Sequence, residues 1–152
     1  MSDWKLISTV NPSGAANVEF TDLTGYKIFK FAFINVNPDT DGTHFQFQVN
    51  ASGQTGYNET MTTTLFSAYQ TESGTDPLLW YNTTDDQAQG TAYQIICRQI
   101  GNGSDENGSG EIFLYNPAST TYVKHFYSRL NAYQAGNYTV EVYAAGYFND
   151  TN

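Results

Sequence analysis

The stretch YKIFKFAFINVNPDTDGTHFQFQ, residues 26–48, determines what fold the rest of this chain can adopt. Apolar and polar residues alternate at its end, with Phe45, Phe47 and Val49 on one side and His44, Gln46 and Gln48 on the other. Successive side chains of an extended backbone point to opposite faces, so this alternation predicts a strand with one solvent-facing side. The run from Ile28 to Ile34 is apolar on both faces. It predicts a central strand that a second sheet or a neighbouring subunit covers on its other side.

Short extended segments separated by strong turn signals continue in both directions from this stretch. No segment keeps a helical period over three turns. The expected strands are 4–10, 17–21, 26–36, 44–50, 61–69, 78–81, 92–100, 111–115, 121–130 and 138–148. We therefore expect an all-β protein, with residues 1–152 forming a single domain folded as an antiparallel, jelly-roll-like β-sandwich. The polar loop GNGSDENGSG, at 101–110, is expected to be a mobile hairpin tip.

Composition limits the classes of partner. The 152 residues include six Lys and Arg against 15 Asp and Glu, a net charge of −9, and 16% are aromatic. Phosphate backbones and anionic membrane surfaces repel such a chain, which argues against nucleic-acid and membrane-surface binding. No apolar run is long enough for a transmembrane helix, and the N-terminal MSDWKLISTV lacks the pattern of a secretory signal. We expect a protein that is made in a cytoplasm.

The residue types needed for catalysis occur without the required arrangement. His44 and His125 each lie inside an expected strand, where a surface or edge imidazole is the simpler interpretation. Cys97 lies among isoleucines and is expected to be a buried, unreactive thiol. Glycosidases need two carboxyl groups facing each other across a cleft, but the acidic pairs here are adjacent in turns: Asp39/Asp41, Asp85/Asp86 and Asp105/Glu106. We therefore predict a protein that is not an enzyme.

Calcium is the alternative that these acidic turns leave open. The segment 39–42, Asp-Thr-Asp-Gly, offers hard oxygen ligands, and Asp105 with Glu106 offers more on a flexible loop. Neither the twelve-residue EF-hand spacing nor a nonapeptide repeat is present. We predict that the protein needs no cofactor, and keep calcium as the alternative.

Trp80 and Tyr81 are the candidate binding residues. They follow Leu78 and Leu79 in a short expected strand. Amphipathic rings provide contact area at a low entropy cost and mark interfaces. The pair therefore predicts a platform on which carbohydrate stacks, or a contact with another protein. The alternative is that one ring closes the end of the sandwich.

Six segments follow one another in a distinctive order: WKLIST (4–9), YKIFKFAFINVNPDTD (26–41), TTTLFSAY (62–69), DQAQGT (86–91), GEIFLYNPASTTYVKHF (110–126) and AGYF (145–148). In this order they resemble the small virion structural proteins of tailed phages that infect marine bacteria, including cyanobacteria. The similarity extends over nearly the whole chain, and residues 116–126 are its most specific part. Members continue past AGYF with another hairpin, whereas this chain stops at residue 152. That departure implies either a missing C-terminal hairpin or a sheet that another chain closes.

The resemblance implies a protein of a phage particle, made in the host cytoplasm and exposed on the virion surface. We expect a non-enzymatic capsid decoration or cement protein that forms symmetric clusters, such as a homotrimer. Its expected partners are copies of itself and other virion proteins. The alternative is a receptor-binding module on a tail fibre or tail tip that recognises host surface glycan, and it predicts a concavity containing Trp80 and Tyr81.

Overall fold

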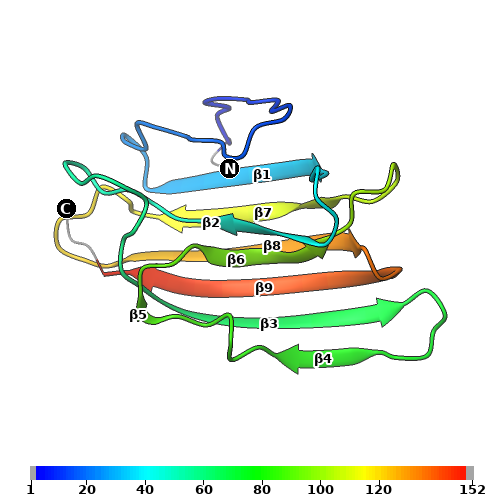
Figure 1. Ribbon diagram of the computed structural model, residues 1–152. Coiled ribbons are helices and arrows are strands. Elements are labelled where there is room, and N and C mark those ends of the chain that lie inside the picture. Colours follow the sequence, from blue (N-terminus) through cyan, green and yellow to red (C-terminus); the bar gives the residue numbers. More distant parts are fainter. Residues whose placement is uncertain (1–2, 150–152) are drawn as a thin grey trace.

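The computed structural model describes residues 3–149, which fold as an all-β structure of nine antiparallel strands with no helix in that range (Figure 1). The strands are β1 (Ile28–Val36), β2 (Thr43–Phe47), β3 (Met61–Thr71), β4 (Leu78–Tyr81), β5 (Ala88–Gly90), β6 (Gln94–Ile100), β7 (Gly108–Tyr115), β8 (Lys124–Gln134) and β9 (Tyr138–Phe148). The all-β class that the sequence predicts is confirmed. The expectation about the C-terminal hairpin concerns residues beyond 149 and lies outside the described range.

The strands form two layers. Six of them make a broad sheet in the order β1-β7-β8-β9-β3-β4, and β5 extends the edge beside β3. The hairpin-like pair of β2 and β6 lies in front of this sheet (Figure 1) and joins it at one position, Ile100 opposite Gln134. The arrangement is consistent with a β-sandwich, although its strand order does not establish a jelly roll.

The core lies between the two layers and follows the alternation of the strands. In β8, for example, Phe126, Ser128, Leu130 and Ala132 point inward and are buried, whereas the residues that alternate with them, 127, 129 and 131, are exposed. Residues of the same kind from β3, β6, β7 and β9 complete one apolar cluster around Leu65 and Val142. A second cluster lies at the other end of the sheet: Met61, Leu114, Phe126 and Phe148.

The N-terminal expectation is wrong. Neither 4–10 nor 17–21 is a strand; residues 3–27 instead run beside β1 as an irregular segment (Figure 1). Trp4 touches Phe113 on one face of the sheet, and Phe20 touches Phe31 on the other. The segment therefore wraps around the edge of β1. Its β-forming residues meet side chains there and not a neighbouring strand, so propensity alone cannot make them a ladder.

Three further expectations need correction. The apolar run of β1 is not a central strand but an outermost one, which within residues 3–149 pairs only with β7. No second sheet covers its outer face in that range, and Ile34 is 78% exposed there. Gln48, expected to face solvent, is buried because its amide donates to three backbone carbonyls.

The loop 101–110 is not simply an exposed tip, because residues 108–110 belong to β7. In addition, the side chain of Asn37 donates to its carbonyls at Gly103 and Glu106.

Candidate functional site

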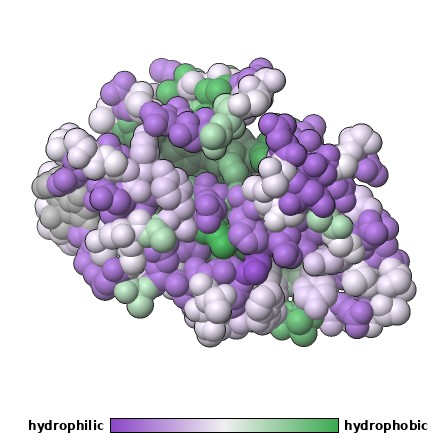
Figure 2. Space-filling view, viewed as in Figure 1, coloured by the Kyte–Doolittle hydropathy of each residue, from purple (hydrophilic) through white to green (hydrophobic). Residues whose placement is uncertain are grey.

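Two surfaces stand out, one on each side of the broad sheet. The first is the outer face, defined here by the outward side chains of β1, β7, β8, β9, β3 and β4. The second is the groove, which opens on the inner side between β4 and β6. Figure 2 shows the molecule from the side of β2 and β6, where the surface is mostly hydrophilic and hydrophobic residues gather over the N-terminal segment and at β4.

The outer face carries aromatic rings in register across neighbouring strands. Phe113 of β7 lies opposite Tyr127 of β8, and their rings stack at 4.9 Å. Phe66 of β3 lies opposite Tyr143 of β9, and these rings stack at 4.8 Å and nearly parallel. Tyr127 and Phe66 are both 41% exposed. Cross-strand aromatic pairs stabilise a sheet, but here they also leave much ring surface in contact with water.

Cations cover part of this aromatic surface and are themselves paired. Lys30 lies 5.3 Å from the centre of the Phe113 ring and 2.5 Å from Glu111. Arg129 lies 5.5 Å from the centre of the Tyr143 ring and forms a salt bridge with Glu141. Exposed pairs of this kind contribute only about 0–1 kcal/mol each. Their main consequence is that the charges of the outer face cancel locally.

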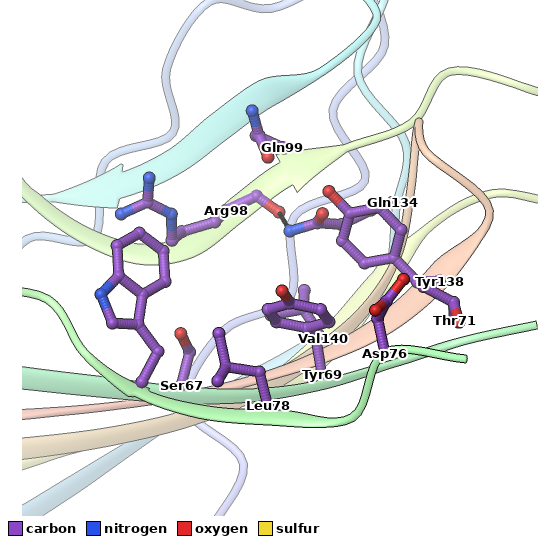
Figure 3. Close-up of a pocket in the computed structure, with 11 residues that line it drawn as sticks. Ser67, Tyr69, Thr71, Asp76, Leu78, Arg98, Gln99, Gln134, Tyr138 and Val140 are labelled. Carbon is purple, nitrogen blue, oxygen red and sulfur yellow. Dashed lines mark hydrogen bonds between the residues drawn. The ribbon is translucent and has the colours of Figure 1, made fainter. Parts of the chain in front are cut away.

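The groove has a volume of about 480 Å³, within the range of roughly 300–1,000 Å³ that is usual for small-ligand sites. Its floor comes from β3 and β9, including Ser67, Tyr69 and Val140. Figure 3 shows Arg98 and Gln99 of β6 across from Tyr69 and Leu78, with Asp76 at one end. The indole of Trp80 also lines it and is 41% exposed.

Arg98 is held in place by a buried ion pair. Its guanidinium forms a salt bridge with Asp85 and lies 5.1 Å from the centre of the Trp80 ring. Asn82, itself buried, donates to the same carboxylate at 2.5 Å. The side chains of Arg98 and Asp85 are only 16% and 9% exposed. Because both partners are largely out of water, removing either one would leave an uncompensated charge.

Gln134, also part of the lining, has an unusual hydrogen-bonding state. Its Nε2 donates to the backbone carbonyl of Arg98 at 3.0 Å, drawn as the dashed line in Figure 3. Its Oε1 is buried and has no donor among the described residues. Rotating the amide would place Oε1 against the carbonyl, so the geometry fixes which atom is left without a partner.

Folding separates the two residues that the sequence singles out. Trp80 lines the groove. Tyr81 points to the opposite face, where its hydroxyl contacts Thr64 and donates to Asp86. Adjacent residues of a strand face opposite ways, so one binding site cannot contain both rings. The other groove residues, including Arg98 and Gln134, gave no sequence signal, because folding brings them together from five separate strands.

The remaining candidate residues have structural partners. His44 accepts a hydrogen bond from the backbone N–H of Gln99, and burial followed by the charge of Arg98 lowers its pKa below 6.5. Cys97 is buried as expected, which raises its pKa to about 12. His125 is exposed beside Tyr147. Asp85 and Asp86 bind different groups, Arg98 and Tyr81 respectively.

The turn proposed for calcium is tied to the opposite loop. The Asp41 carboxylate accepts from the Asn102 backbone N–H at 3.2 Å, and the Asp39 carbonyl accepts from the Asn102 amide at 3.1 Å. Glu106 accepts from the N–H of Gly103 at 2.6 Å. Within residues 3–149, no group of three or more His, Cys, Asp or Glu side chains is placed to hold a metal. Over the same range, no helix could cross a membrane.

Comparisons with protein families, curated proteins and solved structures give no match for this chain.

Proposed function

We propose that this chain is a non-enzymatic structural protein of a phage particle, and that a second copy docks on its outer face within a symmetric cluster on the capsid surface. The resemblance of its sequence segments to phage virion proteins supports the proposal that the chain is part of a phage particle. The observation that supports docking is the stacked aromatic surface of the outer face, which no part of residues 3–149 covers apart from the margin near Trp4.

The apolar pattern of β1 favours the same interpretation. Its inner residues pack against the core, whereas Ile28 and Ile34, on the outer side, are 44% and 78% exposed. A strand that is apolar on both faces is typical of a strand covered on both faces. Trp4, 64% exposed where it meets Phe113, extends the apolar surface at this edge. Packing a neighbour here would bury the ring surface and Ile34 together.

The distribution of charge supports a second copy as the occupant. The charged outward side chains of the strands are Lys30, Arg129, Glu111 and Glu141, which sum to zero. The Asp86 carboxylate reaches only the edge of this face beside β4, where it accepts from the Tyr81 hydroxyl. The rest of the chain has four basic and 13 acidic groups, 6 − 2 and 15 − 2, and carries the whole net charge of −9. Identical acidic chains repel each other over most of their surface. Contact through the outer face brings together the one region where that repulsion is cancelled, as a self-complementary interface requires.

Sedimentation velocity tests the docking. The wild-type chain is expected to sediment as a discrete oligomer, and the pair of substitutions Phe66→Ser and Tyr127→Ser is expected to shift it to the monomer. Tyr93→Ser is the matched control, because Tyr93 is 47% exposed and lies between β5 and β6. A wild-type monomer at all concentrations would overturn the proposal, as would equal dissociation by the control.

Immunogold microscopy tests the location. Antibodies raised against the purified chain are expected to label the heads of intact phage particles in symmetric clusters. Labelling confined to the tail tip would contradict capsid decoration and favour a tail protein. If the particles carry no label and mass spectrometry finds none of the chain in them, the chain is not a virion protein.

A further inference from the structure

We infer that the groove between β4 and β6 binds a neutral oligosaccharide. The site lies on the inner side of the sheet and is independent of the outer face on which the proposed function rests. Its aromatic residues, polar residues and charge each restrict the class of ligand.

The first restriction is the combination of rings with an open shape. Trp80 lies on one wall, and Tyr69 and Tyr138 lie 5.4 Å apart along the floor and end. The C–H groups on the face of a pyranose ring pack on such aromatic surfaces, while its hydroxyl groups project from the ring edge. A groove with rings on its walls and floor that is partly open to solvent fits a sugar chain, part of which stays in water, better than a fully enclosed small molecule.

The second restriction is the supply of polar groups around these rings. The exposed carboxylate of Asp76 contacts only the Thr75 hydroxyl, at 3.3 Å, in the described structure. Arg98 has five N–H donors and one acceptor, Asp85, among residues 3–149. The side chain of Gln99 is exposed on the same wall. A sugar hydroxyl both donates and accepts, so it can use a carboxylate, a guanidinium and an amide arranged in this way.

The third observation is the buried Oε1 of Gln134. A buried acceptor without a donor costs roughly 1–3 kcal/mol, and it is expected to find a water molecule or a ligand group. Gln134 is a lining residue of the groove, so a hydroxyl that displaces the neighbouring side chain of Tyr138 can reach the buried Oε1 and donate to it. An apolar ligand could not, which favours a hydroxyl-rich one.

Charge determines that the oligosaccharide is neutral. Arg98 is offset by Asp85, and Asp76 then adds one negative charge at the groove. The chain as a whole is also strongly acidic. Glycans that carry carboxylate or sulfate groups are therefore repelled, while neutral sugars are not affected.

The backbone of Gln99 suggests that the wall is held in a fixed shape. Gln99 has a φ of 47°, in the left-handed region that side chains rarely adopt. Strained residues of this kind concentrate at binding sites, where the surrounding structure enforces them. Together with the ion pair of Arg98, this gives a preorganised wall, which lowers the entropy cost of binding.

A glycan array containing neutral and acidic oligosaccharides, followed by calorimetric titration with the neutral oligosaccharide that gives the strongest signal, tests the inference. We expect binding of neutral members only. Trp80→Ala is expected to weaken it by about tenfold or more. Trp4→Ala and Leu79→Ala are the matched controls, one for the residue type and one for the strand, because both residues are exposed away from the groove. Neither control should change the affinity.

Asp76→Ala provides the second variant. Asp76 is exposed in the loop before β4, so its loss should reduce binding without affecting folding. No binding to any neutral oligosaccharide, preference for acidic ones, or unchanged affinity in folded Trp80→Ala and Asp76→Ala would overturn the inference. The Trp80→Ala and Asp76→Ala chains should sediment like the wild type. The chain with Phe66→Ser and Tyr127→Ser should still bind the neutral oligosaccharide. Failure of one proposal is thus separable from failure of the other.

Discussion

At the scale of the single residue, His44 links the stability of the protein to pH. Its Nδ1 accepts from the Gln99 N–H at 3.0 Å, and burial lowers its pKa below 6.5. Protonation removes this acceptor. As the pH falls through 6.5, the unfolded chain takes up the proton first, so this contribution to stability is complete above that pH and declines toward the folded-state pKa. Urea unfolding is measured at pH 7.5 and 5.5. Between these values the free energy of unfolding should fall less in His44→Asn than in the wild type, because the amide oxygen of Asn accepts the same bond at both pH values. Equal losses in both chains would contradict this role.

Gln99 makes a second prediction at this scale. Glycine adopts a positive φ without the strain of a side chain, although it adds freedom to the unfolded state. Gln99→Gly should raise the free energy of unfolding by about 0.5–2 kcal/mol. Gln46→Gly is the control, because Gln46 is exposed in β2 without a positive φ, and that change should lower stability by roughly 0.5–1 kcal/mol. Chemical denaturation of both variants measures the difference, and a loss of stability in Gln99→Gly would show that its backbone is unstrained.

At the scale of the element, alternation was the reliable signal. The bounds of β4 and β9 agree with the sequence prediction, and β3 and β8 differ from it only at their ends. The N-terminal segment has the same strand-forming residues and runs beside the outermost strand β1, yet it forms no ladder there. Its side chains contact Phe113 on one face of the sheet and Phe31 on the other, and these contacts determine its path. Gln48 is on the polar side of its strand in sequence, yet backbone carbonyls from two loops draw it inward. The local sequence pattern shows neither the side-chain contacts of the N-terminal segment nor the backbone partners of Gln48.

The candidate sites divide in the same way. Trp80 could be selected from sequence because a Trp-Tyr pair in a short strand is unusual, but the pattern of β4 also separates it from Tyr81. The ion pair of Arg98 and Asp85 and the unpaired Oε1 of Gln134 depend on contacts between strands that are distant along the chain. The outer face was visible only as a high aromatic content, since the register between strands determines which rings stack.

Gly146 in β9 tests the close contact of two central strands. A Cβ at this position would lie 2.4 Å from the Thr62 carbonyl oxygen and 2.8 Å from a methyl group of Thr63. Those atoms belong to β3, which cannot retreat without weakening its ladder with β9. Gly146→Ala should therefore cost about 1–3 kcal/mol in thermal or urea unfolding. Ala145→Ser, one position away on the outer face, should stay within about 0.5 kcal/mol. A neutral Gly146→Ala would show that the strands can separate.

At the scale of the whole molecule, charge is distributed differently over the two faces of the sheet. The charges of the outward strand residues cancel, because Lys30 is paired with Glu111 and Arg129 with Glu141, whereas the groove and the remaining surface are acidic. A face that carries no net charge can approach its own copy. An acidic groove, in contrast, excludes acidic ligands and stays accessible while the outer face is occupied. If both proposals hold, the sheet serves assembly on one side and ligand recognition on the other, without competition between them.

This distribution predicts how salt affects self-association. The repulsion between two chains of net charge −9 acts over distances comparable to the Debye length, about 30 Å at 0.01 M salt and about 8 Å at 0.15 M. Stacked rings buried at the interface are much less sensitive to salt. Raising the NaCl concentration across this range should therefore tighten association through the outer face, measured as a lower dissociation constant in sedimentation equilibrium. Phe66→Ser with Tyr127→Ser should remain monomeric throughout. Weaker association at higher salt would mean that complementary charges, and not the aromatic surface, hold the copies together.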